Sequence, residues 1–211
     1  MQYQANLTQL GTARLHLFET FCLASIRAQT NPNFLWIIYT DPMLDESVRL
    51  PLVRMLANQS NFLLVPSLQH PHFRGSQDVV ISSRDQVWSG DFGLAKRLHE
   101  KSLTTTLLET RLDADDGLPR DFVQRIQRDS RRSVVSETDW KIYCVQQHME
   151  WHPFDRKTLG HSHTSPVGYL KRRKRGLTAC ITAGLTFVFG PRASPNKIGN
   201  NESFSYLVLI T

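Results

Sequence analysis

The chain has 211 residues, of which 40% are hydrophobic and 21% charged, a composition that is typical of globular proteins and excludes a disordered chain. The net charge of +6 is concentrated in one run, residues 171–175, because residues 1–170 carry 18 basic and 18 acidic side chains. One short basic run does not make the broad positive face of a nucleic-acid-binding protein, so the charge alone does not indicate that function.

The length, the N-terminus and the cysteines predict one domain in a reducing compartment. A chain of this size can bury the core of a single α/β domain, to which we assign residues 1–211. No apolar run reaches the roughly 20 residues that span a bilayer, and residues 1–11 lack the charged and apolar regions of a signal peptide. The cysteines are odd in number and widely spaced, which favours buried thiols and a cytoplasmic location: Cys22, Cys144 and Cys180.

Helices and strands alternate in the first third of the chain. Apolar residues recur at helical spacing over residues 14–27, and Pro32 ends that segment in a polar loop. Two almost wholly apolar runs, 34–39 and 61–66, are typical of strands that are covered on both faces, and residues 44–58 between them are predicted to be helical. This order predicts a parallel, right-handed α/β layer.

The middle of the chain predicts a helix, a strand and a second helix. Residues 76–101 have a mainly helical pattern, and the apolar, threonine-rich run 103–108 is typical of a buried strand. Residues 121–130 are predicted to form a helix. Its inward residues are Phe122, Val123 and Ile126.

Strands are expected again near the C-terminus, over residues 142–145 and 177–189. Between them, residues 160–175 are rich in His, Ser, Gly and basic side chains, which predicts an exposed basic loop.

The segment 110–118 places Asp113, Asp115 and Asp116 within four residues, directly after the predicted strand 103–108. Like charges so close raise one another's pKa unless a cation neutralises them. Hard ions such as Mg²⁺ and Mn²⁺ take oxygen ligands and bridge carboxylates to substrate phosphates. One interpretation is therefore a metal–diphosphate site at the C-terminal edge of the sheet, where open α/β folds bind ligands. The other is an acidic turn in which Asp116-Gly117 supplies the turn residues and Asp121 begins the next helix.

Two segments, in order and spacing, resemble one enzyme family. The family is the rhamnosyltransferase group of glycosyltransferase-A-fold enzymes. Its opening helix and loop resemble Phe18-Glu19-Thr20-Phe21-Cys22-Leu23-Ala24-Ser25-Ile26-Arg27-Ala28-Gln29-Thr30-Asn31-Pro32-Asn33-Phe34. Its Asp-x-Asp motif resembles Thr110-Arg111-Leu112-Asp113-Ala114-Asp115-Asp116-Gly117-Leu118. The resemblance implies an open, twisted, mostly parallel sheet flanked by helices. It also implies transfer of a sugar, such as rhamnose, from a nucleotide-sugar donor to an acceptor hydroxyl, with Mn²⁺ or Mg²⁺ bridging the donor diphosphate.

The resemblance assigns roles to five residues. Asp113 matches the aspartate that faces the ribose or sugar and also counts as a metal ligand, Asp115 matches the metal ligand, and Asp116 stands beside it. Asp41, after the second strand, matches the acidic residue that borders the base, whereas Arg111 either neutralises the carboxylates or the diphosphate or forms a structural salt bridge. The general base that deprotonates the acceptor is not identified by spacing. Its candidates are Asp139, Glu150, Asp155 and Glu202.

Three alternatives to an active glycosyltransferase domain remain open from the sequence. Residues 1–7 do not match the family's first strand, so a sheet without that strand, in an incomplete or inactive domain, is one of them. A zinc site could use His148 and His152 on one helix face, with His161 and His163 as further ligands. The third is a phosphate- or nucleic-acid-binding module that uses the basic run 171–175, with affinity that falls steeply with salt.

Overall fold

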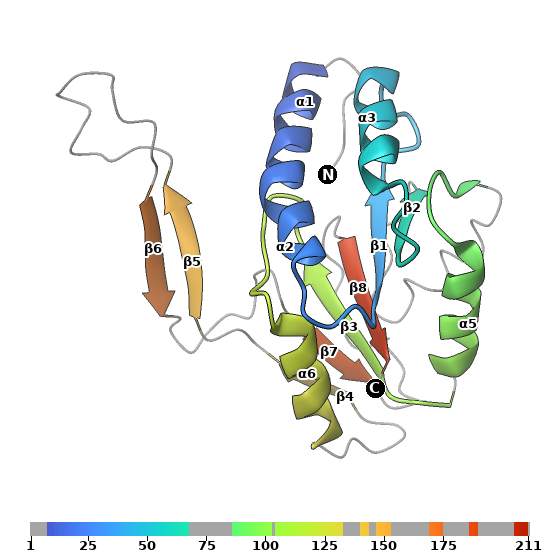
Figure 1. The fold of residues 1–211 in the computed structure, drawn as a ribbon, viewed down its shortest axis with the longest axis vertical. Helices are drawn as coiled ribbons and strands as arrows, with labels where there is room; N and C mark the ends of the chain where they lie inside the picture. The colour runs from blue at the N-terminus through green and yellow to red at the C-terminus, as the bar shows by residue number, and fades with distance from the viewer. Residues whose placement is uncertain are drawn as a thin grey trace. The chain divides into compact units, whose positions relative to one another are not determined.

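The computed structural model describes residues 8–67, 86–102, 104–132, 140–143, 147–152, 169–174, 186–189 and 205–210. They fall into two compact units, which we describe separately: unit 1 takes its residues from 1–143 and 182–211, and unit 2 from 144–181. Unit 1 combines a six-stranded sheet with helices on both of its faces, which confirms the predicted α/β class (Figure 1).

The sheet of unit 1 has the strand order β2-β1-β8-β3-β7-β4. Its strands are β1 (Leu35–Thr40), β2 (Phe62–Pro66), β3 (Leu107–Leu112), β4 (Trp140–Tyr143), β7 (Thr186–Phe189) and β8 (Ser205–Ile210). β1 and β2 are parallel, β8 runs antiparallel to both β1 and β3, and β7 runs antiparallel to both β3 and β4. The sheet is therefore mixed, in contrast to the mostly parallel sheet expected, because two strands of the C-terminal part enter it in the opposite direction.

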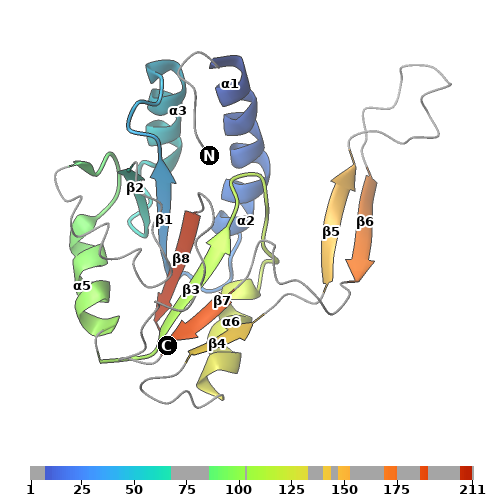
Figure 2. The same ribbon diagram turned by 180° about the vertical axis from the view of Figure 1, so that it is seen from behind.

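The helices of unit 1 include a continuous N-terminal helix made of three segments. The three segments of this helix are α1 (Thr8–Leu17), η1 (Phe18–Leu23) and α2 (Ala24–Arg27). The other helices are α3 (Glu46–Leu56), α5 (Phe92–Ser102) and α6 (Phe122–Arg131). The residues at both ends of η1 keep right-handed helical dihedrals, so η1 is a wider π-helical turn inside one helix. π-Helical turns are rare and frequently occur at functional sites. Figures 1 and 2 show this helix beside α3 on one side of the sheet.

The two faces of the sheet bury different side chains. Alternate residues of β1 and β2 pack against α5 on one face, where the buried cluster comprises Leu35, Ile37, Leu63, Val65, Ala95 and Leu107. On the other face, Trp36 is fully buried, stacks on Phe18 of η1 at 5.5 Å between ring centroids, and meets Phe62 edge to face at 5.1 Å. The apolar runs thus form strands that are covered on both faces, as their composition predicts.

Several boundaries differ from the sequence-based expectation: the N-terminal helix begins at Thr8 and not at residue 14, and the strand expected over 142–145 is Trp140–Tyr143. The strand predicted over 103–108 begins only at Leu107, because the hydroxyls of Thr104 and Thr105 donate to the carbonyl of Lys101 at 3.2 and 2.9 Å and so belong to the end of α5. α5 itself begins at Phe92, and residues 76–85 of the helical segment expected there lie outside the described residues. The helix predicted over 121–130 is confirmed as α6, with all three inward residues buried.

Unit 2 contains a two-stranded antiparallel ribbon. β5 (Gln147–His152) pairs with β6 (Tyr169–Lys174), so that Glu150 lies opposite Lys171. β6 falls within the segment expected to be a basic loop, whose other residues, 160–168 and 175, lie outside the described residues. The helix face that the zinc alternative requires at His148 and His152 is not formed: both residues lie on β5, where residues four apart are separated by about 13 Å along the strand.

Asp45 begins α3 and supports a prediction about stability and pH. Its carboxylate accepts a hydrogen bond from the backbone N–H of Ser47 at 2.8 Å and one from the Ser47 hydroxyl, and these two bonds lower the pKa of Asp45. Because the folded pKa is lowered, the stabilisation is present above about pH 4 and is lost as the pH falls through the folded pKa. Asp45→Ala should lower the melting temperature by a few degrees at pH 7, but much less at pH 3. Asp45→Ser keeps a capping oxygen that does not titrate, so it should be close to wild type at pH 7 and should lose less stability than wild type between pH 7 and pH 3. An Asp45→Ala variant whose melting temperature lies equally far below wild type at both pH values would contradict this account.

Candidate functional site

The carboxyl ends of β1 and β3 lie at the same edge of the sheet, because both strands run antiparallel to β8 between them. Asp41 follows β1 and Asp113 follows β3 directly. Ile37 and Arg111 both pair with Tyr206 of β8, so β1 and β3 are two strand spacings apart, about 10 Å across the sheet. Asp41 lies four residues after Ile37 and Asp113 two after Arg111, so Asp41 is also about 7 Å further along the strand direction. The structure therefore brings two of the predicted site residues to one edge.

Asp41 is held in a tight turn after β1. Its carboxylate accepts a hydrogen bond from the backbone N–H of Met43 at 2.8 Å, and its carbonyl accepts one from Leu44 at 3.1 Å. The side chain is half-buried. The start of this turn is also bonded to the residue after β2, because the N–H of Ser67 donates to the carbonyl of Thr40 at 2.9 Å.

The acidic residues after β3 form a short turn, Asp113–Asp116, which we call the acidic turn. The N–H of Asp116 donates to the carbonyl of Asp113 at 3.2 Å, which brings the ends of the turn together. Asp115 is exposed, whereas Asp113 and Asp116 are half-buried. Leu112 before the turn and Leu118 after it are both buried, so apolar anchors flank the carboxylates on both sides.

The acidic turn lies beside η1, where it changes the electrostatic environment of Cys22. The thiol of Cys22 is fully buried and is not in a disulfide, as the sequence predicts for this cysteine. Burial raises the pKa of Cys22, and the negative charges of Asp116, Asp115 and Asp113 raise the pKa further. All three carboxylates therefore act on one point of the helix, and their summed field favours a cation over an anion there.

The acidic turn is not a complete metal cage. Among the residues that the structure describes, no three side chains of Asp, Glu, His or Cys converge as ligands of one ion. Mg²⁺ and similar ions commonly use one or two protein carboxylates and fill the remaining positions with phosphate oxygens and water. Because the carboxylates of Asp113, Asp115 and Asp116 do not all converge, at most two of them can bind one ion, which is the number that this pattern uses.

Arg111 lies on β3, two residues before the acidic turn, and is half-buried. Strand alternation places it on the same face as Leu107, the face that α5 covers. Its neighbour Thr110 is fully buried on the opposite face, where its hydroxyl is 2.8 Å from the hydroxyl of Thr186 on β7. The guanidinium is thus carried by the central strand that also carries the acidic turn.

Ser25 and Gln29 contact the segment after the acidic turn, and sequence reasoning assigned no role to either. The Ser25 hydroxyl accepts a hydrogen bond from the N–H of Leu118 at 3.1 Å. The amide group of Gln29 donates to the carbonyl of Pro119 at 2.8 Å and accepts from the N–H of Val123 at 3.1 Å. The run of polar residues from Gln29 to Asn33 was the available signal, but it does not reveal which distant segment these side chains contact.

A second set of contacts joins the same loop to α6. The side chain of Asn31 donates to Gln127 at 2.5 Å, and Gln127, although almost fully buried, donates in turn to the carbonyl of Asn33 at 2.9 Å. The N–H of Thr30 donates to the carbonyl of Arg120 at 2.9 Å. The loop before β1 is therefore hydrogen-bonded to the loop and helix that follow β3.

Several residues proposed from the sequence lie outside the described residues or on β5. Asp139, Asp155, Glu202, His161 and His163 lie outside the described residues. Glu150 and His148 lie on β5, and the structure gives only their backbone positions. Four of the five residues of the basic run lie on β6.

No helix in the described part of the chain is long and apolar enough to cross a membrane. A search of curated proteins and a search of solved structures each found no match. The family described as "Putative rhamnosyl transferase" matches residues 8–148, a range that extends from α1 into β5 and includes both the Gln29–Asn33 loop and the acidic turn. The match covers well over half of the chain, so this protein belongs to that family of glycosyl-transferring proteins.

Proposed function

We propose that this chain is a glycosyltransferase domain of the glycosyltransferase-A type, which transfers a sugar, such as rhamnose, from a nucleotide-sugar donor to an acceptor hydroxyl. The proposal is based on one observation: β1 and β3 end at the same edge of the sheet, where Asp41 follows β1 and the acidic turn follows β3. Ligands of open α/β sheets bind beyond the carboxyl ends of the strands, which is where these residues lie. Family membership supports the reaction class.

The positions of the acidic residues support one orientation of the donor. Asp41 follows β1, which the antiparallel strand β8 separates from β3, so it lies about 10 Å to the side of Asp113. A nucleoside diphosphate that lies along this edge would place its base and ribose toward Asp41 and its diphosphate toward the acidic turn. Asp113, the first residue of the acidic turn, is then the carboxylate that we expect to face the ribose or the sugar.

Asp113, Asp115 and Asp116 are the residues that we expect to hold a divalent cation, Mn²⁺ or Mg²⁺. The donor diphosphate is itself an anion, and three carboxylates would repel it, so a cation must mediate the contact. The incomplete set of protein ligands at the turn suits an ion that takes its remaining oxygens from the diphosphate. When bound, such an ion supplies electrostatic stabilisation of the charge that grows on the departing diphosphate.

Glycosyl transfer breaks the bond between the anomeric carbon and the diphosphate oxygen. Preorganised positive charge near that oxygen lowers the barrier more than charge that must first be oriented. Arg111 sits on the central strand that leads into the acidic turn, and we assign it the role of a fixed positive charge near the carboxylates and the diphosphate. The acceptor hydroxyl loses its proton to a general base, which the described residues do not identify.

The experiment that tests the proposed function is a calorimetric titration of Mn²⁺ in the presence of UDP, GDP or dTDP. Wild type should bind the metal together with at least one of the diphosphates, and Asp115→Asn should weaken that binding about 10-fold or more, because it removes a charged ligand. Asp115 is exposed, so the substitution should leave the melting temperature unchanged.

Asp129→Asn is the matched control for this titration. Asp129 lies on α6 and pairs with Arg128 at 3.3 Å, and its loss removes the same charge from a different place. The control should bind like wild type. If wild type binds no metal–diphosphate pair, or if Asp115→Asn and Asp129→Asn behave alike, the proposed function is wrong.

A further inference from the structure

We propose that Gln29 and Ser25 are positioning residues that hold the acidic turn in the geometry required for the metal–diphosphate pair. This inference rests on the proposed function and adds residues that do not themselves touch the donor. The three carboxylates of the acidic turn lie within four residues of one short turn, so their negative charges repel one another. Some part of the fold must oppose that repulsion when no cation is bound.

One end of the acidic turn is fixed by the sheet. Leu112, the last residue of β3, is fully buried and pairs with Ser205 of β8. Asp113 follows at once, so its backbone is tied to the central strands. The other end has no strand to hold it, because the chain passes through Gly117 and Pro119 before α6 begins at Phe122.

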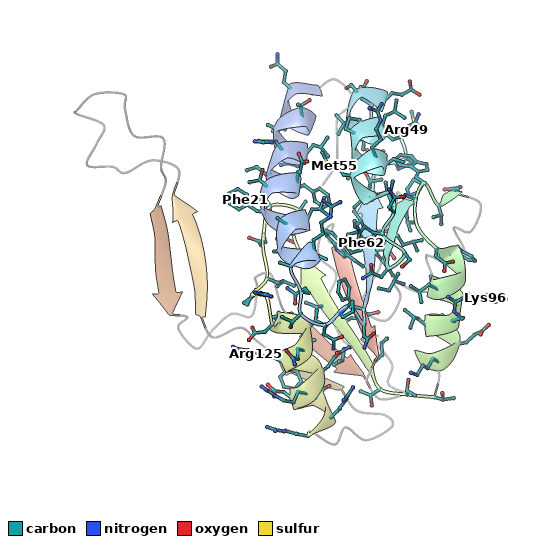
Figure 3. The ribbon with its side chains drawn as sticks, viewed as in Figure 1. Phe21, Arg49, Met55, Phe62, Lys96 and Arg125 are labelled. Atoms are coloured by element: carbon teal, nitrogen blue, oxygen red, sulfur yellow. The ribbon has the colours of Figure 1, made fainter. Side chains whose placement is uncertain are left out.

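Ser25 holds this second end at Leu118, two residues after the turn. Its hydroxyl accepts from the N–H of Leu118 at 3.1 Å and donates to the carbonyl of Cys22 at 2.8 Å, so both of its hydrogen-bonding functions are used. Gly117 fits closely against the same place: a Cβ at Gly117 would lie 3.4 Å from the Ser25 Cβ and 3.6 Å from the carbonyl oxygen of Phe21. Figure 3 labels Phe21 on η1, beside the loop that leads from β3 to α6.

Gln29 ties the next residues of the same segment to α2. Its amide nitrogen donates to the carbonyls of Ser25 at 3.1 Å and Pro119 at 2.8 Å, while its amide oxygen accepts from the N–H of Val123. One side chain thus bridges the end of α2, the loop and the first turn of α6. Hydrogen bonds to backbone groups on three segments define the position of the loop more strictly than apolar contact could.

The consequence is that the carboxylates stay at the edge of the sheet in the absence of metal. The cation then meets a turn that is already in place, so less of its binding energy goes into ordering the loop. Groups that orient metal ligands without touching the metal change affinity about 10- to 100-fold when they are replaced. Gln29 and Ser25 act on Asp113 and Asp115 through the backbone of the segment after the turn, at Leu118 and Pro119.

The test replaces Gln29 by Met, which has similar length and forms none of the three hydrogen bonds. Thr30→Val is the matched control, because among the described residues the Thr30 hydroxyl bonds only the exposed side chain of Gln124, at 3.2 Å, and the control keeps the backbone bond of Thr30 to Arg120. Affinity for Mn²⁺ with UDP, GDP or dTDP is measured by calorimetry well below the melting temperature, and the bound Mn²⁺ is also observed by electron paramagnetic resonance. Ser25→Ala, which removes a single hydroxyl, is the second variant if Gln29→Met does not fold.

We expect Gln29→Met and Ser25→Ala to weaken metal–diphosphate binding about 10-fold or more and to alter the resonance spectrum, whereas Thr30→Val matches wild type. A role confined to stability would lower the melting temperature and leave affinity and spectrum unchanged, and that result would overturn the inference. Loss of binding in wild type itself would instead reject the proposed function and this inference with it.

Discussion

A chain that ends at residue 204, before β8, is expected to lose cooperative unfolding altogether. β8 lies between β1 and β3 and pairs with three residues of β1 and six of β3. Without it the sheet divides into β2–β1 and β3–β7–β4, and the inner edges of β1 and β3 lose their hydrogen-bond partners. Unsatisfied backbone groups next to the fully buried Leu35, Trp36 and Leu108 are costly, and the two parts have no other strand to join them.

Urea unfolding followed by circular dichroism and by fluorescence measures this effect. A chain that ends at Ile210 keeps β8 and is the control, and it should unfold in a single transition that both probes report alike. The chain that ends at residue 204 should show a broad or absent transition and bind a hydrophobic dye in buffer. A sharp transition at the control's midpoint would show that β8 does not hold the two parts of the sheet together.

The sequence predicted local elements better than it predicted their partners. β1, β2 and α6 follow from apolar periodicity and from the polar loops around them, because each pattern is complete within about ten residues. The apolar run 207–210 has the composition of a strand, but nothing in it indicates that it lies antiparallel between β1 and β3. That placement depends on pairing with strands that lie roughly 100 and 170 residues earlier, which periodicity does not record.

The candidate site shows the same division. Three acidic residues after an apolar run are visible in the sequence, and the structure places them at the end of β3. The contacts of Gln29 with Pro119 and Val123 join residues about 90 positions apart, so no local pattern could have shown them. The zinc alternative at His148 and His152 shows a related ambiguity, because a spacing of four residues fits a helix face and also one face of a strand.

Gly90→Ala is expected to destabilise unit 1 by on the order of 4 kcal/mol, the second large effect that the structure predicts. Residues 88–90 lie along β2, where the N–H of Leu64 donates to the carbonyl of Ser89 at 2.9 Å and the N–H of Trp88 donates to the carbonyl of Leu64 at 3.0 Å. Gly90 has a φ of 105°, which L-residues rarely adopt. A Cβ there would lie 2.0 Å from the carbonyl oxygen of Phe62, and because that atom is backbone in a buried strand it cannot move aside cheaply.

Gly93→Ala is the matched control, since it makes the same change three residues later in the chain. A Cβ at Gly93 would meet only side-chain atoms, Asp91 Oδ1 at 3.0 Å and Arg97 Nη1 at 3.3 Å, and Gly93 lies inside α5, where alanine is favoured over glycine. We therefore expect Gly93→Ala to change the free energy of unfolding by less than about 1 kcal/mol in either direction. Urea unfolding of both variants separates a general effect of removing glycine from the specific overlap at Gly90. Equal midpoints for the two variants would mean that residues 88–90 do not lie against β2 as the structure has them, and that the edge of β2 is covered in some other way.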